Sequence, residues 1–304
     1  MGQGDVEHDL APIGAVVNAL RHDYPDVSHS SLRFLEREGL IVPTRTTGGH
    51  RLYATADIQR VRQIKDWQAQ RLSIEEIRNR LAKLAAVSAP DVLADQFLEH
   101  ALAGDLASAR RTILTASDLG LSLDVIFGSV LRPALWELGK RWTNGAVSVA
   151  QEKEVSEVTR DLIAELGLRA AAPSGSATGG VVAACVAGER HELGLRMVSG
   201  LLRARGVSVH FLGADVDPVF LVDAVERRRP RAVLLSATSD EQLPAIQAAA
   251  NALRKLQPMP QLLAGGQAIE RQPDIVTGWG ITPLLLNDVH QLDKLAISLL
   301  AADG

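Results

Sequence analysis

The chain has 304 residues, 46% of them hydrophobic and 22% charged, which suffices for two or three globular domains that each bury a core. A single cysteine, Cys185, excludes an internal disulfide and a cysteine-rich metal site, and it fits a reducing cytoplasm. No apolar run approaches the roughly 18 residues of a membrane span, and the polar N-terminus lacks the apolar core of a signal peptide. We therefore expect a soluble, cytoplasmic protein without membrane contacts.

The net charge of −4 is unevenly distributed along the chain. Residues 28–83 hold eleven Lys and Arg against six Asp and Glu, a balance of +5, so the rest carries −9. A basic stretch in an acidic chain is typical of a nucleic-acid-binding module, although many solvated helices reach the same charge.

Composition divides the chain into three blocks. Small residues with a proline at 85–92 and a Gly/Ser/Pro-rich linker at 171–180 separate them. We expect three domains, at residues 1–86, 87–172 and 173–304. The expected fold class is multidomain, α and α/β: a winged helix-turn-helix, a four-helix bundle and a Rossmann-like doubly wound parallel sheet.

The first block predicts two short helices followed by a hairpin. Apolar spacing favours an amphipathic helix at residues 13–20. Ser28 is a suitable N-cap for the next helix, and Gly39 ends it. Two extended pieces around Gly48-Gly49 then predict a β-hairpin, which can serve as a wing.

The run from Leu32 to Tyr53 reads LRFLEREGLIVPTRTTGGHRLY, and it resembles the pattern of the MerR family of transcriptional regulators. The resemblance implies binding to double-stranded promoter or operator DNA, with the helix from Ser28 in the major groove and the wing on the backbone. We expect Glu36 and Glu38 to pair with neighbouring arginines, and the same arginines would be plain surface residues if DNA is not bound. The implied DNA-contacting residues are Arg33, Arg37, Arg45, His50 and Arg51.

The second block predicts helices alone, and it contains two tryptophans close together. The expected helices are residues 91–102, 105–118, 122–141 and 148–168. We expect Trp136 to pack in the core, whereas Trp142 lies near a helix end and can face a ligand.

The spacing Trp142-x9-Glu152, followed by Lys153, resembles the W-x9-E-H motif of light-sensing cobalamin regulators of the CarH type. The resemblance implies that Trp142 and Glu152 contact the upper, adenosyl face of the corrin. Lys153 stands where the motif has His, and Thr143 stands where light-sensing members have a His able to bind cobalt. Because Thr is a poor cobalt ligand, the resemblance implies a cobalamin pocket without the usual light-adduct ligand.

The third block alternates strands and helices, which implies a doubly wound parallel sheet. The expected strands are residues 181–186, 207–212, 232–236, 262–266 and 281–286. Ligands of such sheets bind at the carboxyl ends of the strands, near a topological switch point. His191 follows the first strand and therefore lies in that zone.

The spacing Glu189-x-His191-x-x-Gly194 resembles the [DE]-x-H-x-x-G motif of cobalamin-binding domains of the methionine-synthase type. Those domains also carry a serine after the third strand and a Gly-Gly turn after the fourth. Ser236 and the pair Gly265-Gly266 stand at these places.

This resemblance implies that cobalamin (vitamin B12) binds base-off, with His191 as the lower axial ligand of cobalt. Neutral imidazole is a good transition-metal ligand, and a nearby carboxylate, Glu189, can orient it. Gly194, Gly265 and Gly266 would leave room for the nucleotide tail, and Ser236 would hydrogen-bond the tail or the His–Glu pair.

The two resemblances together predict a cobalamin-dependent, DNA-binding transcriptional regulator. No nucleophile or proton-transfer constellation is visible, so we do not expect an enzyme. The resemblance implies adenosylcobalamin as the cofactor and a homo-oligomer, dimer or tetramer, whose assembly and DNA affinity follow the cofactor. It also implies a photoreceptor triggered through cleavage of the cobalt–carbon bond.

Two alternatives remain open. A corrinoid methyl-carrier protein would share the cobalamin half, but it has no use for a DNA-binding block. The same regulator scaffold would instead sense another upper-face ligand, or bind a second chromophore such as the bilin biliverdin, if Thr143 and Lys153 leave a roomier upper face.

Overall fold

The fold is described from a computed structural model, which describes residues 10–46, 48–86, 89–172, 179–284 and 289–301. The chain forms two structural units: Met1–Val87 with Asp118–Ser122, and Ser88–Ser117 with Leu123–Gly304. Each unit is described by itself. Within the described residues, no helix combines the length and apolar character that spanning a membrane requires.

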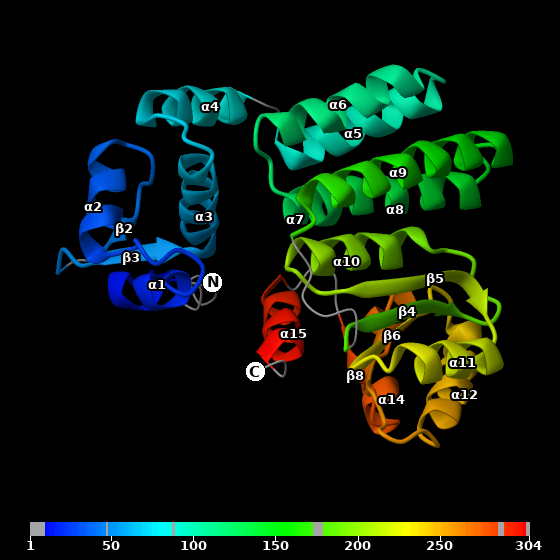
Figure 1. The fold of residues 1–304 in the computed structure, drawn as a ribbon. Coiled ribbons are helices and arrows are strands. Elements are labelled where there is room, and N and C mark those ends of the chain that lie inside the picture. The colour runs from blue at the N-terminus through cyan, green and yellow to red at the C-terminus, as the bar shows by residue number, and fades with distance from the viewer. Residues whose placement is uncertain (1–9, 47, 87–88, 173–178, 285–288, 302–304) are drawn as a thin grey trace, which may run out of the picture. The chain divides into compact units, whose positions relative to one another are not determined.

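The first unit combines short helices with a small antiparallel sheet (Figure 1). Among its described residues the sheet order is β1-β3-β2. The hairpin expected around Gly48-Gly49 is confirmed, because β2 pairs antiparallel with β3. Its elements are β1 (Leu10–Pro12), α1 (Ile13–Leu20), α2 (His29–Arg37), β2 (Thr44–Arg45), β3 (Arg51–Ala54), α3 (Thr55–Ala69) and α4 (Ile74–Ala86).

Helix α2 begins where the sequence predicts. The Ser28 hydroxyl accepts a hydrogen bond from the Ser31 amide at 3.1 Å, and the Ser31 hydroxyl lies 2.8 Å from the Ser28 amide, which closes a capping box. Leu32 and Leu35 are fully buried on the inner face of α2, which turns the intervening Arg33 outward. Strand β1 was not expected from the sequence.

The second unit begins with helices at the expected places. Its described helical part consists of α5 (Pro90–Leu102), α6 (Leu106–Asp118), α7 (Leu123–Val125), the π-helical segment η2 (Ile126–Leu131), α8 (Arg132–Thr143) and α9 (Val149–Ala170). The π segment precedes Pro133, which has no amide hydrogen to donate. The Arg132 amide donates to the Phe127 carbonyl, five residues back, so the ladder changes register at the proline.

The prediction that Trp136 packs in the core is wrong, because 59% of this residue is exposed. Trp136 shares one face of α8 with Arg132 and Lys140, which lie four residues away on either side. The Lys140 ammonium stands 5.1 Å from the centre of a Trp136 ring. Ala134 and Leu138 form the buried face of α8 instead.

The remaining described part of this unit is an α/β fold whose five strands are all parallel, in the order β5-β4-β6-β7-β8. The strands are β4 (Val181–Val186), β5 (Val209–Val216), β6 (Ala232–Ser236), β7 (Gln261–Gly265) and β8 (Thr282–Pro283). The helices are α10 (Leu193–Ala204), α11 (Pro218–Arg228), η3 (Asp240–Gln242), α12 (Leu243–Leu253), α13 (Gln267–Arg271), α14 (Pro273–Gly278) and α15 (Val289–Ala301).

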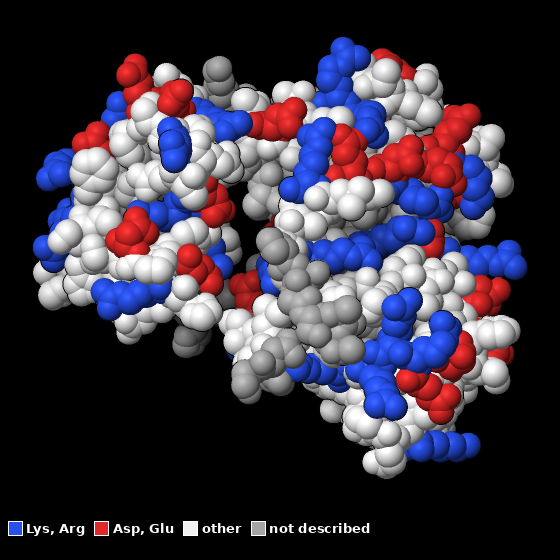
Figure 2. Space-filling view, viewed as in Figure 1, with Lys and Arg blue, Asp and Glu red and all other residues white. Residues whose placement is uncertain are grey.

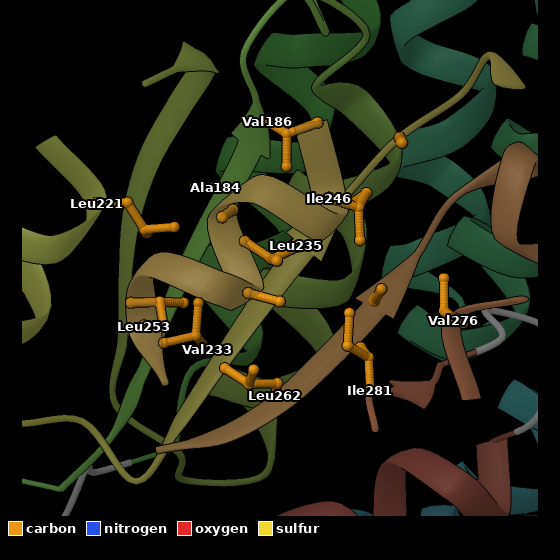
Figure 3. Packing of buried hydrophobic residues seen from close by; sticks show 14 of the residues in the cluster. Ala184, Val186, Leu221, Val233, Leu235, Ile246, Leu253, Leu262, Val276 and Ile281 are labelled. Atoms are coloured by element: carbon orange, nitrogen blue, oxygen red, sulfur yellow. The ribbon is translucent and has the colours of Figure 1, made fainter. Parts of the chain in front are cut away.

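The expected Rossmann-like doubly wound sheet is thus confirmed. Strand β5 ends four residues later than expected, and of the strand expected at 281–286, positions 285–286 fall outside the described residues. Figure 3 shows the core on one side of the sheet, where Val233 and Leu235 of β6 meet Ile246 and Leu253 of α12, all fully buried or nearly so. Burial of both sheet faces explains the unbroken apolar run of β4.

The strand order determines where a ligand site can form. Helix α10 follows β4 and leads to β5 on one side, whereas β6 lies on the other side of β4. The switch point of the topology is therefore between β4 and β6, whose carboxyl ends meet at the same edge of the sheet.

Helix α10 also packs closely against α9 of the helical part (Figure 1). A Cβ atom added at Gly167 of α9 would lie 3.7 Å from the Gly200 Cα atom of α10, and one added at Gly200 would lie 3.2 Å from the Phe127 ring. Gly200 is the tighter of the two positions, because an added Cβ would press on the Phe127 ring, whereas the distance at Gly167 is an ordinary van der Waals contact.

Candidate functional site

The loop after β4 is held by one buried carboxylate, that of Glu189, which is 1% exposed. One carboxylate oxygen accepts hydrogen bonds from the His191 amide and from His191 Nδ1, both at 2.7 Å. The other oxygen accepts from the Thr238 amide, in the segment after β6. The carboxylate thus joins the loops that follow the two strands at the switch point.

The same contacts determine which nitrogen of His191 is available. Burial alone would raise the pKa of Glu189, but hydrogen bonds from His191 and Thr238 outweigh it and hold that pKa below its usual value. Because the carboxylate is ionised, Nδ1 must carry the proton, which leaves the lone pair of a neutral ring on Nε2. The side chain is 78% exposed, so Nε2 is open to a ligand or metal.

Charges from the helical part also act on His191. The hydrogen bond with Glu189 raises the pKa of His191, burial lowers it, and the charges of Glu189 and Glu152 raise it further, while Lys153 opposes them. Glu152 and Lys153 lie in the first turns of α9, and Arg160 of the same helix contacts Glu192, the residue after His191.

The glycines of the motif differ in their surroundings. A Cβ atom added at Gly194 would meet nothing within 4 Å, so this position opens onto free space. Gly266 has φ +101°, and an added Cβ would lie 2.3 Å from the Ala237 carbonyl oxygen. At Gly265 the Cβ would lie 2.9 Å from the Leu284 carbonyl oxygen. Backbone packing within the fold therefore already requires glycine at 265 and 266.

Ser236 and Cys185 lie side by side on β6 and β4. Burial and the charges of Glu189 and Glu192 raise the pKa of the Cys185 thiol to about 12, and a hydrogen bond with Ser236 partly opposes them. The thiol also points at the His191 carbonyl oxygen, at 3.8 Å. On the β6 side, the hydrogen bond to Glu189 comes from the backbone amide of Thr238, just after the strand. The sequence did not predict this donor, because a backbone amide is present at almost every residue type.

The polar residues expected at the upper face have partners close to them in sequence. Glu152 accepts from the Ser156 hydroxyl at 2.8 Å and pairs with Lys153 at 3.1 Å. The Thr143 hydroxyl donates to the Gly139 carbonyl of its own helix at 2.8 Å. Trp142 is half exposed at the end of α8, where its carbonyl accepts from the Gly145 amide in the turn to α9.

In the first unit, Glu36 joins the helix to the wing. Its carboxylate accepts hydrogen bonds from Arg45 of β2 at 2.7 Å and from Arg51 of β3 at 2.5 Å. Glu38 pairs with Arg78 of α4 at 3.0 Å. The expectation that both glutamates pair with arginines is confirmed.

The remaining basic residues of this set face solvent. Arg33, Arg37 and His50 are exposed, and the Arg37 guanidinium stands 5.5 Å from the Phe34 ring. Basic side chains stand along the outer edge of α2 in Figure 2. Helix α2 and the wing thus present cations on elements that Glu36 ties together, an arrangement suited to DNA phosphates.

Three family models match the chain. The model of the MerR HTH family regulatory protein covers residues 25–84, and two models of a B12 binding domain cover residues 93–166 and 179–281. Together they cover the block with α2 and the wing, the helical block and the α/β block.

Curated relatives and solved structures extend this likeness. The chain is 30% identical to the HTH-type transcriptional repressor CarH of Myxococcus xanthus over 252 residues, which cover 78% of this chain and 83% of the relative. It is 27% identical to the repressor CarA of the same organism over 250 residues, 79% of this chain and 82% of the relative. The monomethylamine corrinoid protein of Methanosarcina barkeri superimposes with a TM-score of 0.58 at 16% identity, over 69% of this chain and all of that chain, which shows the shared fold.

The Glu36 contacts predict an acid-sensitive link between α2 and the wing. Hydrogen bonds from Arg51 and Arg45 hold the pKa of Glu36 below its usual value. A carboxylate of lowered pKa contributes stability above its ordinary pKa, and this contribution is lost as the pH falls through the lowered value. We expect Glu36→Gln to lower the midpoint of thermal unfolding of the first unit by a few degrees at pH 7, and the difference from wild type to vanish in acid.

The measurement is thermal unfolding followed by circular dichroism between pH 7 and pH 3. Glu38→Gln is the matched control, since Glu38 pairs with Arg78 alone, and a smaller change is expected there. Equal midpoints for wild type and Glu36→Gln at pH 7 would refute the link.

Proposed function

We propose that cobalamin bound through His191 controls the affinity of this chain for operator DNA, because the chain belongs to the family of MerR-type transcriptional regulators with B12-binding domains. Membership makes the chain a cobalamin-binding, DNA-binding transcription regulator rather than an enzyme. We assign residues 1–86 to DNA binding, residues 87–172 to a helical domain above the cofactor, and residues 173–304 to the domain below it.

The lower ligand assignment is supported by the Glu189–His191 pair. A metal-bound histidine usually donates its other ring N–H to a carboxylate, which fixes the tautomer and raises the basicity of the ligating nitrogen. Nδ1 of His191 makes that bond at 2.7 Å, and its ring is largely exposed. The open space at Gly194 suits the nucleotide tail of a base-off cofactor. This pair is the observation that carries the proposal.

For the upper face we propose contacts from Trp142 and Glu152. The contact between Arg160 of α9 and Glu192 supports this, because it ties the helix that begins near Glu152 to the residue after His191. When bound, adenosylcobalamin supplies a cobalt–carbon bond that light can break.

The residues here that replace the usual histidines are engaged elsewhere: Thr143 bonds its own helix, and Lys153 pairs with Glu152. That observation favours, as a second candidate, a different upper ligand or a second chromophore such as biliverdin on the same scaffold.

For DNA recognition we propose that α2 enters the major groove and that the wing follows the backbone. Arg33 and Arg37 lie on the exposed side of α2, opposite the buried leucines. Arg45, Arg51 and His50 belong to the hairpin that Glu36 ties to α2, so helix and wing would engage the duplex as one body. We further propose that the DNA-bound form is a homo-oligomer, a dimer or tetramer, whose assembly the cofactor controls.

His191→Ala is expected to abolish histidine coordination of cobalt. In cob(II)alamin bound to protein labelled with ¹⁵N-histidine, the electron paramagnetic resonance spectrum should show a doublet nitrogen splitting, and the variant should lose it. Cobalamin affinity should fall by at least the roughly 10- to 100-fold typical of losing a partner of a metal ligand. The control is His100→Ala, an exposed position on α5. An unchanged spectrum and affinity in His191→Ala would exclude this ligand.

Arg33→Ala and Arg45→Ala are expected to weaken DNA binding in different ways. Loss of a base-edge contact by Arg33 should cost about 1–3 kcal/mol and relax sequence preference at one position. Loss of a phosphate contact by Arg45 should weaken binding evenly and reduce the salt slope by about one. The assay is a gel shift on the DNA upstream of its own gene, with Arg60→Ala on α3 as the exposed control. Affinities equal to that control would contradict the assignment.

Illumination is expected to change assembly and DNA affinity together. Protein purified in the dark with adenosylcobalamin should form the larger oligomer and shift DNA, and light should reduce both. Light scattering after size exclusion and a gel shift measure the two responses, and absorption spectra before and after light identify the chromophore. A spectrum that cobalamin cannot explain would support the second chromophore, and no response to light would point to a chemical sensor.

A further inference from the structure

The residue after His191 is a second largely buried carboxylate. Glu192 lies at the N-terminus of α10, and its side chain is 13% exposed. One of its oxygens lies 3.1 Å from Arg160 Nε of α9 and 3.0 Å from Arg196 Nε of α10. A charge with this little exposure is stable only when it is paired, so the two arginines belong to the loop structure.

The two arginines connect Glu192 to different parts of the unit. The Arg196 guanidinium lies over the Phe211 ring of β5, 4.5 Å from its centre. Arg160 also pairs with Glu157 of its own helix. In Figure 2, Lys and Arg side chains gather along the seam between α9 and α10, the helices that carry these residues. Glu192 therefore links the His191 loop to the sheet on one side and to the helical part on the other.

Residues on one face of α9 interact with two successive residues of the His191 loop. Glu152, Ser156 and Arg160 follow one another at intervals of four, so they lie on the same side of the helix. Glu152 acts on His191 through its charge, and Arg160 bonds Glu192. Further along, Gly167 of α9 and Gly200 of α10 lie close together where the two helices pack against each other.

We propose that Glu192 is a positioning residue that, through Arg160, holds the His191 loop against α9 and so couples the His191–cobalt bond to the helical domain. The inference rests on the proposed binding of cobalamin through His191. With the link intact, the residue after His191 stays tied to α9, the helix that carries Glu152 near its start. A displacement of the loop when the bond to cobalt forms or breaks is passed to α9 through the Arg160 guanidinium.

The test is a double-mutant cycle of Glu192→Gln and Arg160→Gln in the full chain. Glutamine keeps the side-chain size and removes the charge. The matched control is Glu165→Gln on α9, because Glu165, like Glu192, is a carboxylate paired with two arginines, here Arg110 and Arg169. Arg160→Lys keeps the positive charge. Its loop exchange and cobalamin affinity should therefore lie between those of wild type and Arg160→Gln, which a loss of packing alone would not explain.

Two readouts are needed, one of them without cofactor. In the cofactor-free protein, hydrogen exchange of amides 187–192 should speed up in either single variant. In the loaded protein, each single variant should weaken cobalamin binding by roughly threefold to thirtyfold, as expected for one coupled ionic contact. For part of the bound cob(II)alamin, the nitrogen splitting from histidine should also disappear from the electron paramagnetic resonance spectrum. The double variant should be no worse than either single one, and Glu165→Gln should match wild type.

Three results would overturn the inference: loop exchange and affinity unchanged in both single variants, effects that add in the double variant, or an equal effect of Glu165→Gln. Failure of the proposed function is recognised separately, because the wild-type protein itself would then show no splitting from histidine. If wild type shows the splitting, His191→Ala loses it, and the Glu192 variants behave as wild type, only the coupling through Glu192 is refuted.

Discussion

The buried carboxylate of Glu189 is the contact on which the cofactor side of the molecule depends. An ionised group almost without solvent exposure is tolerated only when its oxygens accept hydrogen bonds, and here His191 and Thr238 donate them. Those donors come from the loops after β4 and β6, which are adjacent only because the sheet order places these strands side by side. The tautomer of His191, and with it the ring nitrogen that is left open, follows from this burial.

Two further glutamates each pair with two arginines. Glu36 holds Arg45 and Arg51 in the first unit, and Glu192 holds Arg160 and Arg196 in the second. Salt weakens partly exposed pairs of this kind. In both cases one carboxylate joins segments that are distant in sequence. Helix α2 with its hairpin and the His191 loop are thereby each held by charged pairs as well as by apolar packing.

Local signals explain how far the sequence predicted this molecule. The capped start of α2, the helix at residues 13–20 and the buried run of β4 were all predicted, because caps and apolar patterns act within a few residues. Strand β1 was missed, because three residues carry no alternation and become a strand only by pairing with β3. Trp136 was wrongly placed in the core, since its face of α8 is decided by Arg132 and Lys140 rather than by its own hydrophobicity. The partners of Glu189 and Glu192 depend on tertiary contacts that no local pattern contains.

The π segment before Pro133 has a consequence for how side chains are aimed. An α-helix turns by about 100° per residue, so a stretch with bonds to the fifth residue back absorbs one additional residue and rotates everything after it by about that angle. Ile126–Leu131 thus sets the rotation of α8 relative to α7. The direction of Trp142 is set by that offset as much as by its own position in the sequence. If the same residues formed a regular α-helix instead, the tryptophan would point more than a quarter turn away, with its chemistry and its neighbours in sequence unchanged.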